Sequence, residues 1–184
     1  MIINITLTDF TDFTVFTDFT VFTPMYLWID PGVRKLWYAL IRDDLTIVES
    51  GILLQNKKWV TREDQFVRME QIFNFFVKLL RTYDIKAVSI EKLYFTDRNQ
   101  SNAEFIYGIR WALAMLFFQH NIPLYEYTPN ELKKRVTGTG KANKLLVQKM
   151  IQKIYSLEEM PQYDDAADAL GLARIIVNMK TLKN

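Results

Sequence analysis

The sequence contains no cysteine and a single histidine, His120, among its 184 residues. The lack of cysteine excludes disulfides, thiolate zinc sites and a cysteine nucleophile, and one histidine excludes a multi-histidine metal site. Any metal ion would therefore be held mainly by oxygen, which favours magnesium, manganese or calcium. No apolar run reaches the roughly 18 residues of a membrane span, so we expect no membrane partner.

Charge also gives little indication of a partner. The chain has 23 basic and 21 acidic residues, and a net charge of +2 does not by itself predict nucleic-acid binding. The apolar fraction of 49% and the charged fraction of 24% are ordinary for a globular protein. The length suits one domain with a full core.

Residues 1–24 differ from the rest of the chain. From Thr8 onward they repeat in threes as Thr-Asp-Phe or Thr-Val-Phe, and this period fits neither a strand nor an α-helix. The segment holds three acidic and no basic residues, so the net charge without it is +5 rather than +2. We expect 1–24 to be disordered or not native. It is either a DNA repeat translated upstream of a start at Met25, which we favour, or an unstructured leader.

Residues 25–184 form one predicted domain without an internal linker. Apolar runs predict strands at 26–30, 36–42, 45–54, 86–91 and 124–127. Apolar spacing predicts a short helix after Thr128 and longer helices at 62–81, 101–119, 141–155 and 164–179. In the first helix the expected buried face is Phe66, Met69, Phe73, Phe76 and Leu80. This order predicts an α/β fold with a mixed five-stranded sheet, three antiparallel strands then two parallel, flanked by helices.

Four carboxylates are placed to converge at one edge of this sheet. Asp30 ends the first strand and Glu91 ends the fourth, while Asp165 and Asp168 share a face of the last helix. Four acids this close repel each other unless cations compensate. Two divalent ions about 3.5–4 Å apart are the usual arrangement for phosphodiester hydrolysis. Each acid alone is better explained as a turn, strand-end or helix-start residue, so the prediction rests on the set.

A basic, glycine-rich segment occupies residues 132–144. Five cations surround Gly138 and Gly140, namely Lys133, Lys134, Arg135, Lys141 and Lys144. Glycine lets the backbone approach a phosphate, and the cations neutralise its charge. The segment is either a phosphate-binding loop or a solvated basic loop. Tyr94 and Phe95, just after Glu91, either stack on an unpaired base or belong to the core.

Three segments resemble the acidic motifs of the RuvC family of Holliday-junction resolvases, in the same order and at similar spacing. They are Ile-Asp-Pro-Gly at 29–32, Ile-Glu-Lys-Leu-Tyr-Phe at 90–95 and Asp-Ala-Ala-Asp-Ala-Leu at 165–170. The segment at 136–140 is similar to the family's Val-Gly-x-Gly loop with its flanking lysines. The similarity covers residues 25–178.

The resemblance implies an RNase H-like fold and a homodimeric, magnesium-dependent endodeoxyribonuclease of recombination and repair. The enzyme would make paired symmetric nicks in four-way DNA junctions and leave 5′-phosphate and 3′-hydroxyl ends. It would use two Mg²⁺ ions per site, with Mn²⁺ as a substitute. Branch-migration machinery is an implied partner. The implied location is the cytoplasm with the nucleoid in a bacterium, or another reducing compartment that contains DNA.

The resemblance also assigns roles to individual residues. Asp30, Glu91, Asp165 and Asp168 would be the catalytic metal ligands. Lys133 and Lys144 would contact DNA, with Lys144 near the scissile phosphate, and Tyr94 matches an aromatic wedge. Two alternatives stay open: an RNase H-like nuclease acting on flaps, forks or RNA–DNA hybrids, and a junction-binding protein that does not cut. Clustered acids argue against the second, because negative charge opposes phosphate binding.

Overall fold

The computed structural model describes residues 3–6, 23–32, 34–54, 61–92, 100–160 and 171. One six-stranded sheet lies at its centre, with the strand order β1-β4-β3-β2-β5-β6. The strands are β1 (Ile3–Thr6), β2 (Met25–Asp30), β3 (Lys35–Arg42), β4 (Ile47–Leu54), β5 (Ile85–Glu91) and β6 (Leu124–Tyr127). The helices are α1 (Arg62–Thr82), α2 (Gln100–Gln119), α3 (Pro129–Thr137) and α4 (Lys144–Ile154).

The strand directions confirm the predicted mixed sheet. β2, β3 and β4 form an antiparallel meander, and β5 and β6 continue the sheet in parallel from β2. The strand count of five was one too low, because β1 pairs in parallel with the outer edge of β4. Residues 3–6 therefore depart from the disordered segment expected at 1–24. Residues 7–22, which hold most of the repeat, lie outside the described part of the chain.

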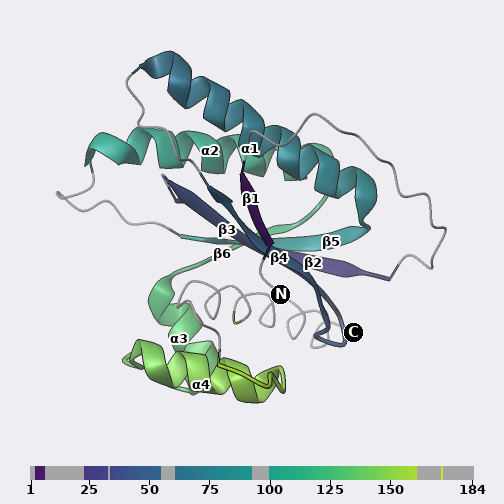
Figure 1. Ribbon diagram of the computed structural model, residues 1–184, viewed down its shortest axis with the longest axis vertical. Helices are drawn as coiled ribbons and strands as arrows, with labels where there is room; N and C mark the ends of the chain where they lie inside the picture. The colour runs from purple at the N-terminus through teal and green to yellow at the C-terminus, as the bar shows by residue number, and fades with distance from the viewer. Residues whose placement is uncertain are drawn as a thin grey trace.

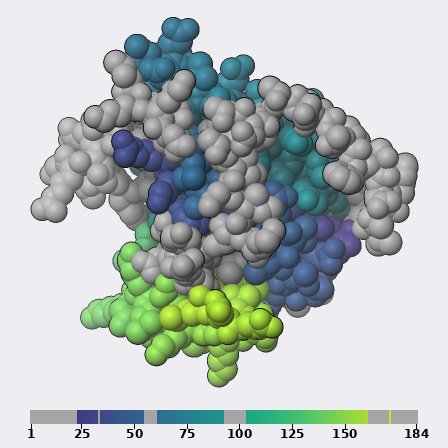
Figure 2. All heavy atoms as spheres, viewed as in Figure 1, coloured from purple at the N-terminus to yellow at the C-terminus, as the bar shows by residue number. Residues whose placement is uncertain are grey.

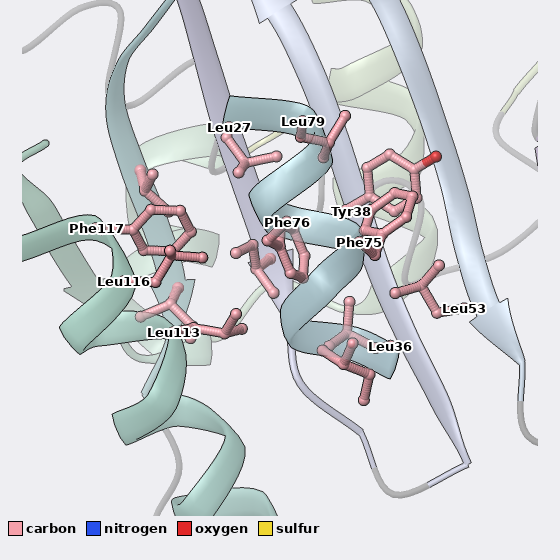
Figure 3. Close-up of a cluster of buried hydrophobic side chains, with 14 of the residues drawn as sticks. Leu27, Leu36, Tyr38, Leu53, Phe75, Phe76, Leu79, Leu113, Leu116 and Phe117 are labelled. Carbon is pink, nitrogen blue, oxygen red and sulfur yellow. The ribbon is translucent and has the colours of Figure 1, made fainter. Parts of the chain in front are cut away.

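The sheet carries a layer of helices on each face (Figure 1). α1 and α2 cover one face, and the shorter α3 and α4 lie on the other. The larger core fills the space under α1 and α2, where Tyr38, Phe75, Phe76 and Phe117 meet edge to face (Figure 3). A second core cluster joins the opposite face of the sheet to α3 and α4. Both faces of the central strands are thus buried, which explains their nearly continuous apolar sequences.

The buried face of α1 agrees with the predicted one in part: Phe76 is buried, and Met69, Phe73 and Leu80 pack half-buried against the core. Phe66 is 60% exposed, whereas Arg68, two residues later, is fully buried. The Arg68 guanidinium donates to the Leu53 carbonyl at the end of β4, and burial lowers its pKa to about 10. Apolar spacing missed this position because the cation satisfies a strand-end carbonyl, which hydrophobicity does not report.

The starts of β4 and α4 also differ from the predicted ones. β4 begins at Ile47 because Leu45 adopts a left-handed φ of 69° in the turn after β3. α4 begins at Lys144 rather than Lys141, and the Asn143 side chain caps it by accepting from the Leu146 N–H. α3 has the predicted start, with Thr128 as N-cap and Pro129 in the first turn. Within the described residues, none of the helices has both the length and the apolar character of a membrane span.

Candidate functional site

Asp30 and Glu91 lie side by side at the same edge of the sheet. β2 and β5 are parallel and stay in register up to the pair Ile29–Ile90, so the next residue of each strand is an acid. Asp30 also pairs with Trp37 on β3, and Glu91 pairs with Tyr127 on β6. Four neighbouring strands therefore each place one residue in a row across the sheet, in the order Trp37, Asp30, Glu91 and Tyr127.

The two acids project toward α3 and α4. Side chains alternate along a strand, and Leu27 and Ile29 belong to the core under α1 and α2. Tyr26 and Trp28 belong to the opposite cluster, so Asp30 continues that second set. The same alternation along β5 places Glu91 on the α3–α4 side. Both residues are half-buried at the strand ends.

The described residues contain only this half of the predicted carboxylate set. Asp165 and Asp168 lie outside the described residues, and among those described no three His, Cys, Asp or Glu side chains gather. Convergence of all four acids therefore stays a prediction. Gly171, three residues after Asp168, is buried in a helical turn against α3 and α4. A Cβ there would come within 2.9 Å of Leu132 and Val136, so the close packing depends on glycine.

Gly32 fixes the turn that follows Asp30. A Cβ on Gly32 would lie 2.2 Å from the backbone carbonyl oxygen of Lys35, at the start of β3. No side chain fits at that distance without moving backbone. The Asp-Pro-Gly sequence therefore holds the end of β2 close to the start of β3, with Pro31 buried beneath the turn.

The backbone of Glu91 is held by an arginine that sequence reasoning missed. Arg110, on α2, donates from Nη1 to the Glu91 carbonyl oxygen at 2.8 Å. Its Nη2 pairs with the Glu126 carboxylate on β6. The signal in the sequence was the single charged residue in the run 105–118, next to the buried position Ile109.

The basic segment forms the end of α3 and the turn into α4. Gly138 caps α3 with a left-handed φ of 84°, as a helix C-terminus commonly requires. Gly140 follows in the turn, where the Thr139 side chain accepts from the Lys141 N–H. The predicted DNA-contacting cations lie on this segment: Lys134, Arg135, Lys141 and Lys144 are exposed and Lys133 is half-buried.

Arg135 links the basic segment to the row of acids. Its guanidinium carbon lies 5.5 Å from the centre of the Tyr127 ring, within the range of a cation–π contact. Burial raises the pKa of Tyr127, although the charge of Arg135 opposes that shift. Burial thus favours the neutral phenol, and the face of its ring lies next to the Arg135 guanidinium. Tyr94 and Phe95 lie outside the described residues, so their predicted stacking role stays a prediction.

Comparison with known proteins agrees with this arrangement. The family model described as crossover junction endodeoxyribonuclease RuvC matches residues 26–176. The protein of that name from Thermosipho melanesiensis is 32% identical over 148 residues, covering 79% of this chain and 91% of its own length. The one from Pseudothermotoga lettingae is 34% identical, covering 79% and 88%.

Solved structures show the same fold. Thermus thermophilus RuvC superimposes with a TM-score of 0.72 at 22% identity, covering 85% of this chain and 96% of its own. The same protein in complex with a Holliday junction substrate gives 0.71. The yeast mitochondrial resolvase Ydc2 gives 0.57 at 14% identity, covering 85% of this chain and 80% of its own.

The sheet order and the helical layers define an α/β protein with the fold of these solved structures. Within that class, the extent of the family match and the identity to curated relatives decide the family. The chain belongs to the RuvC family of crossover junction endodeoxyribonucleases.

The close approach at Gly32 gives a stability prediction. Gly32→Ala should lower the free energy of unfolding by about 1–3 kcal/mol, because the new Cβ meets backbone that cannot rotate away. Urea denaturation measures the change. Gly108→Ala is the matched control, since its Cβ would meet the flexible end of Met69 at 3.2 Å. We expect the control to stay within about 1 kcal/mol of wild type. Equal stability of Gly32→Ala and wild type would contradict the close approach.

Proposed function

We propose that the protein resolves four-way DNA junctions by making paired symmetric nicks with a divalent metal, during recombination and repair. The observation that carries this proposal is the in-register pair of Asp30 and Glu91, which faces a basic helical segment in a RuvC-family chain. The bacterial relatives support a place in the bacterial cytoplasm with the nucleoid. Branch-migration machinery would present the junction.

The residues fit a hard divalent cation. Asp30 and Glu91 offer carboxylate oxygens from adjacent strand ends, and the chain has no cysteine to favour a softer metal. We propose Mg²⁺, two ions per site with Mn²⁺ as a substitute, held by these acids together with Asp165 and Asp168. When bound, such ions activate water for attack and stabilise the leaving 3′ oxygen, giving 5′-phosphate and 3′-hydroxyl ends.

The side chains of the basic segment hold the DNA. Lys134, Arg135, Lys141 and Lys144 are exposed around the α3–α4 turn and would neutralise phosphates on both sides of the cut. Lys144, at the first turn of α4, is the cation we place nearest the scissile phosphate, where it would stabilise developing negative charge. α3 and α4 form one continuous surface on their side of the sheet (Figure 2).

Paired nicks require two active sites, and α2 offers a surface for a second copy. Trp111, Met115 and Phe118 are 69%, 52% and 75% exposed, and their spacing of four and three places them on one face of the helix. An exposed apolar face of this kind marks an interaction site. A two-fold pairing through α2 buries the same residues on both chains and leaves the α3–α4 surfaces free.

Replacing one proposed metal ligand should separate cutting from binding. Asp30→Asn should abolish cleavage of a labelled four-way junction in Mg²⁺ and keep junction affinity, because the phosphate contacts remain. Asp43→Asn, in the exposed turn between β3 and β4, is the matched control and should cut normally. Gel analysis reports the nicks and a binding titration reports affinity.

Other results of this assay point elsewhere. Wild-type protein that binds junctions without cutting them, in Mg²⁺ and Mn²⁺ alike, would support the non-cutting alternative. Cleavage of forks, flaps or RNA–DNA hybrids but not of junctions would favour an RNase H-like nuclease of other specificity. Equal loss of binding and cutting in Asp30→Asn would make Asp30 structural.

A cation of the basic segment should contribute to the salt dependence of binding. Lys133→Ala should weaken junction binding and reduce the slope of log affinity against log salt by roughly one counterion. Fluorescence anisotropy at several salt concentrations measures the slope. Lys86→Ala is the control, because Lys86 lies at the start of β5, the opposite end of that strand from Glu91. An unchanged slope would remove Lys133 from the DNA surface.

The proposed dimer surface predicts the effect of one charge on α2. Trp111→Glu should convert a dimer into a monomer, because burying an unpaired carboxylate in an apolar interface is costly. Sedimentation velocity measures the mass. Leu145→Glu places the same charge at an exposed leucine of α4, on the other side of the sheet, and should leave the dimer intact. A dimeric Trp111→Glu variant would exclude this surface.

A further inference from the structure

We propose that Arg110 is a positioning residue that holds the Glu91 end of β5 in the place needed for metal binding. The inference rests on the proposed function, because it concerns how the proposed ligand Glu91 is fixed. It assigns a role to a residue of α2 that belongs to none of the acidic or basic motifs.

Arg110 joins three elements through one side chain. It reaches from α2 to the Glu91 backbone of β5, with Nη1 2.8 Å from the carbonyl oxygen, and to the Glu126 carboxylate of β6. Its side chain is only 9% exposed, compared with 46% for Glu126. The planar guanidinium fixes both acceptors in direction as well as in distance.

The end of β5 also contacts β6. Beyond Glu91, the Lys92 N–H donates to the Tyr127 carbonyl at 2.7 Å. That partner belongs to β6, a four-residue strand at the edge of the sheet. Arg110 connects this short strand to β5 from the helix side. It therefore holds both β5, which carries the proposed ligand Glu91, and the neighbouring strand β6.

A pocket lies next to the contacts that Arg110 makes with Glu91 and Glu126. A pocket of about 370 Å³ opens between α2 and the ends of β5 and β6, lined by Ile90, Lys92, Tyr107, Arg110, Trp111 and Glu126 among others. Without the arginine contacts the strand end has room to shift into this pocket. A carboxylate that must meet a metal ion with hard geometric requirements would then lose its position while the fold persists.

The nearly buried cation points to positioning rather than to stability. Removing a guanidinium from water costs free energy that its partners only partly return, so the burial of Arg110 is weak evidence of stabilisation. The exposed pair of Arg62 and Glu104 also involves α2, at 2.6 Å, but its side chains are 58% and 72% exposed. That pair provides a matched control in the same protein.

The test measures metal binding and DNA binding separately in the full-length protein. Arg110→Met keeps the length of the side chain and removes the donors, and Arg110→Lys retains the charge with a single donor group. We expect Arg110→Met to weaken Mn²⁺ affinity, measured without DNA by electron paramagnetic resonance, by roughly 10- to 100-fold. The Mg²⁺ concentration for half-maximal cleavage should rise in step. Junction affinity in EDTA should not change, and Arg110→Lys should be intermediate.

Controls distinguish a loss of positioning from a general loss of folding. Arg62→Met should match wild type in all three measurements, and circular dichroism checks the fold of each variant. If Arg110→Met does not fold, Glu126→Gln tests the same contact from its other end, and a smaller loss of Mn²⁺ affinity is expected. Wild-type Mn²⁺ affinity in a folded Arg110→Met, or in Glu126→Gln where only that variant folds, would overturn the inference alone. Wild-type protein that neither binds Mn²⁺ nor cuts a junction would overturn the proposed function, and this inference with it.

Discussion

The parallel pairing of β2 with β5 is the constraint on which the site depends. It brings Asp30 and Glu91, which are far apart in sequence, to adjacent positions one step beyond the Ile29–Ile90 pair. A slip of one residue in this register would turn one acid toward the core under α1 and α2. The register is secure because both faces of these strands are buried, so a slip would also misplace several fully buried side chains. The same packing that stabilises the fold therefore sets the geometry of the acids.

The two faces of the sheet differ in the size of the core that they bury. The face under α1 and α2 carries the larger core, with the edge-to-face contacts of Tyr38, Phe75 and Phe76 (Figure 3). The opposite face carries a smaller cluster under two short helices whose outer surface is basic. The site thus lies on the side of the sheet with the smaller core cluster, where close contacts at Gly32 and Gly171 fix the turn after Asp30 and the approach to α3 and α4.

Sequence reasoning predicted the elements well and some contacts poorly. The five strands after residue 24 and the helices α1 to α3 were found because apolar runs and capping residues such as Thr128 are local signals. The pairing of β1 with β4 was missed because four residues beside a repeat carry no distinct pattern. The exposure of Phe66 and the roles of Arg68 and Arg110 were missed for a different reason. Each of these features depends on the tertiary contacts of a helix with its neighbouring elements. Arg68 and Arg110 both donate to backbone carbonyls at the ends of strands.

In the proposed function, the acids and the basic segment, which have opposite charges, act on the same phosphodiester. Acids alone would repel DNA, and a basic loop alone would bind it without cutting. Tyr127 brings the two together, because it is the register partner of Glu91 and its ring lies 5.5 Å from the Arg135 guanidinium. A cation of the proposed DNA-binding surface is thereby placed relative to a carboxylate of the sheet edge through one aromatic side chain. The spacing between the proposed phosphate contacts and the proposed cutting site would then be a property of the fold, and it would not have to be set anew when DNA binds.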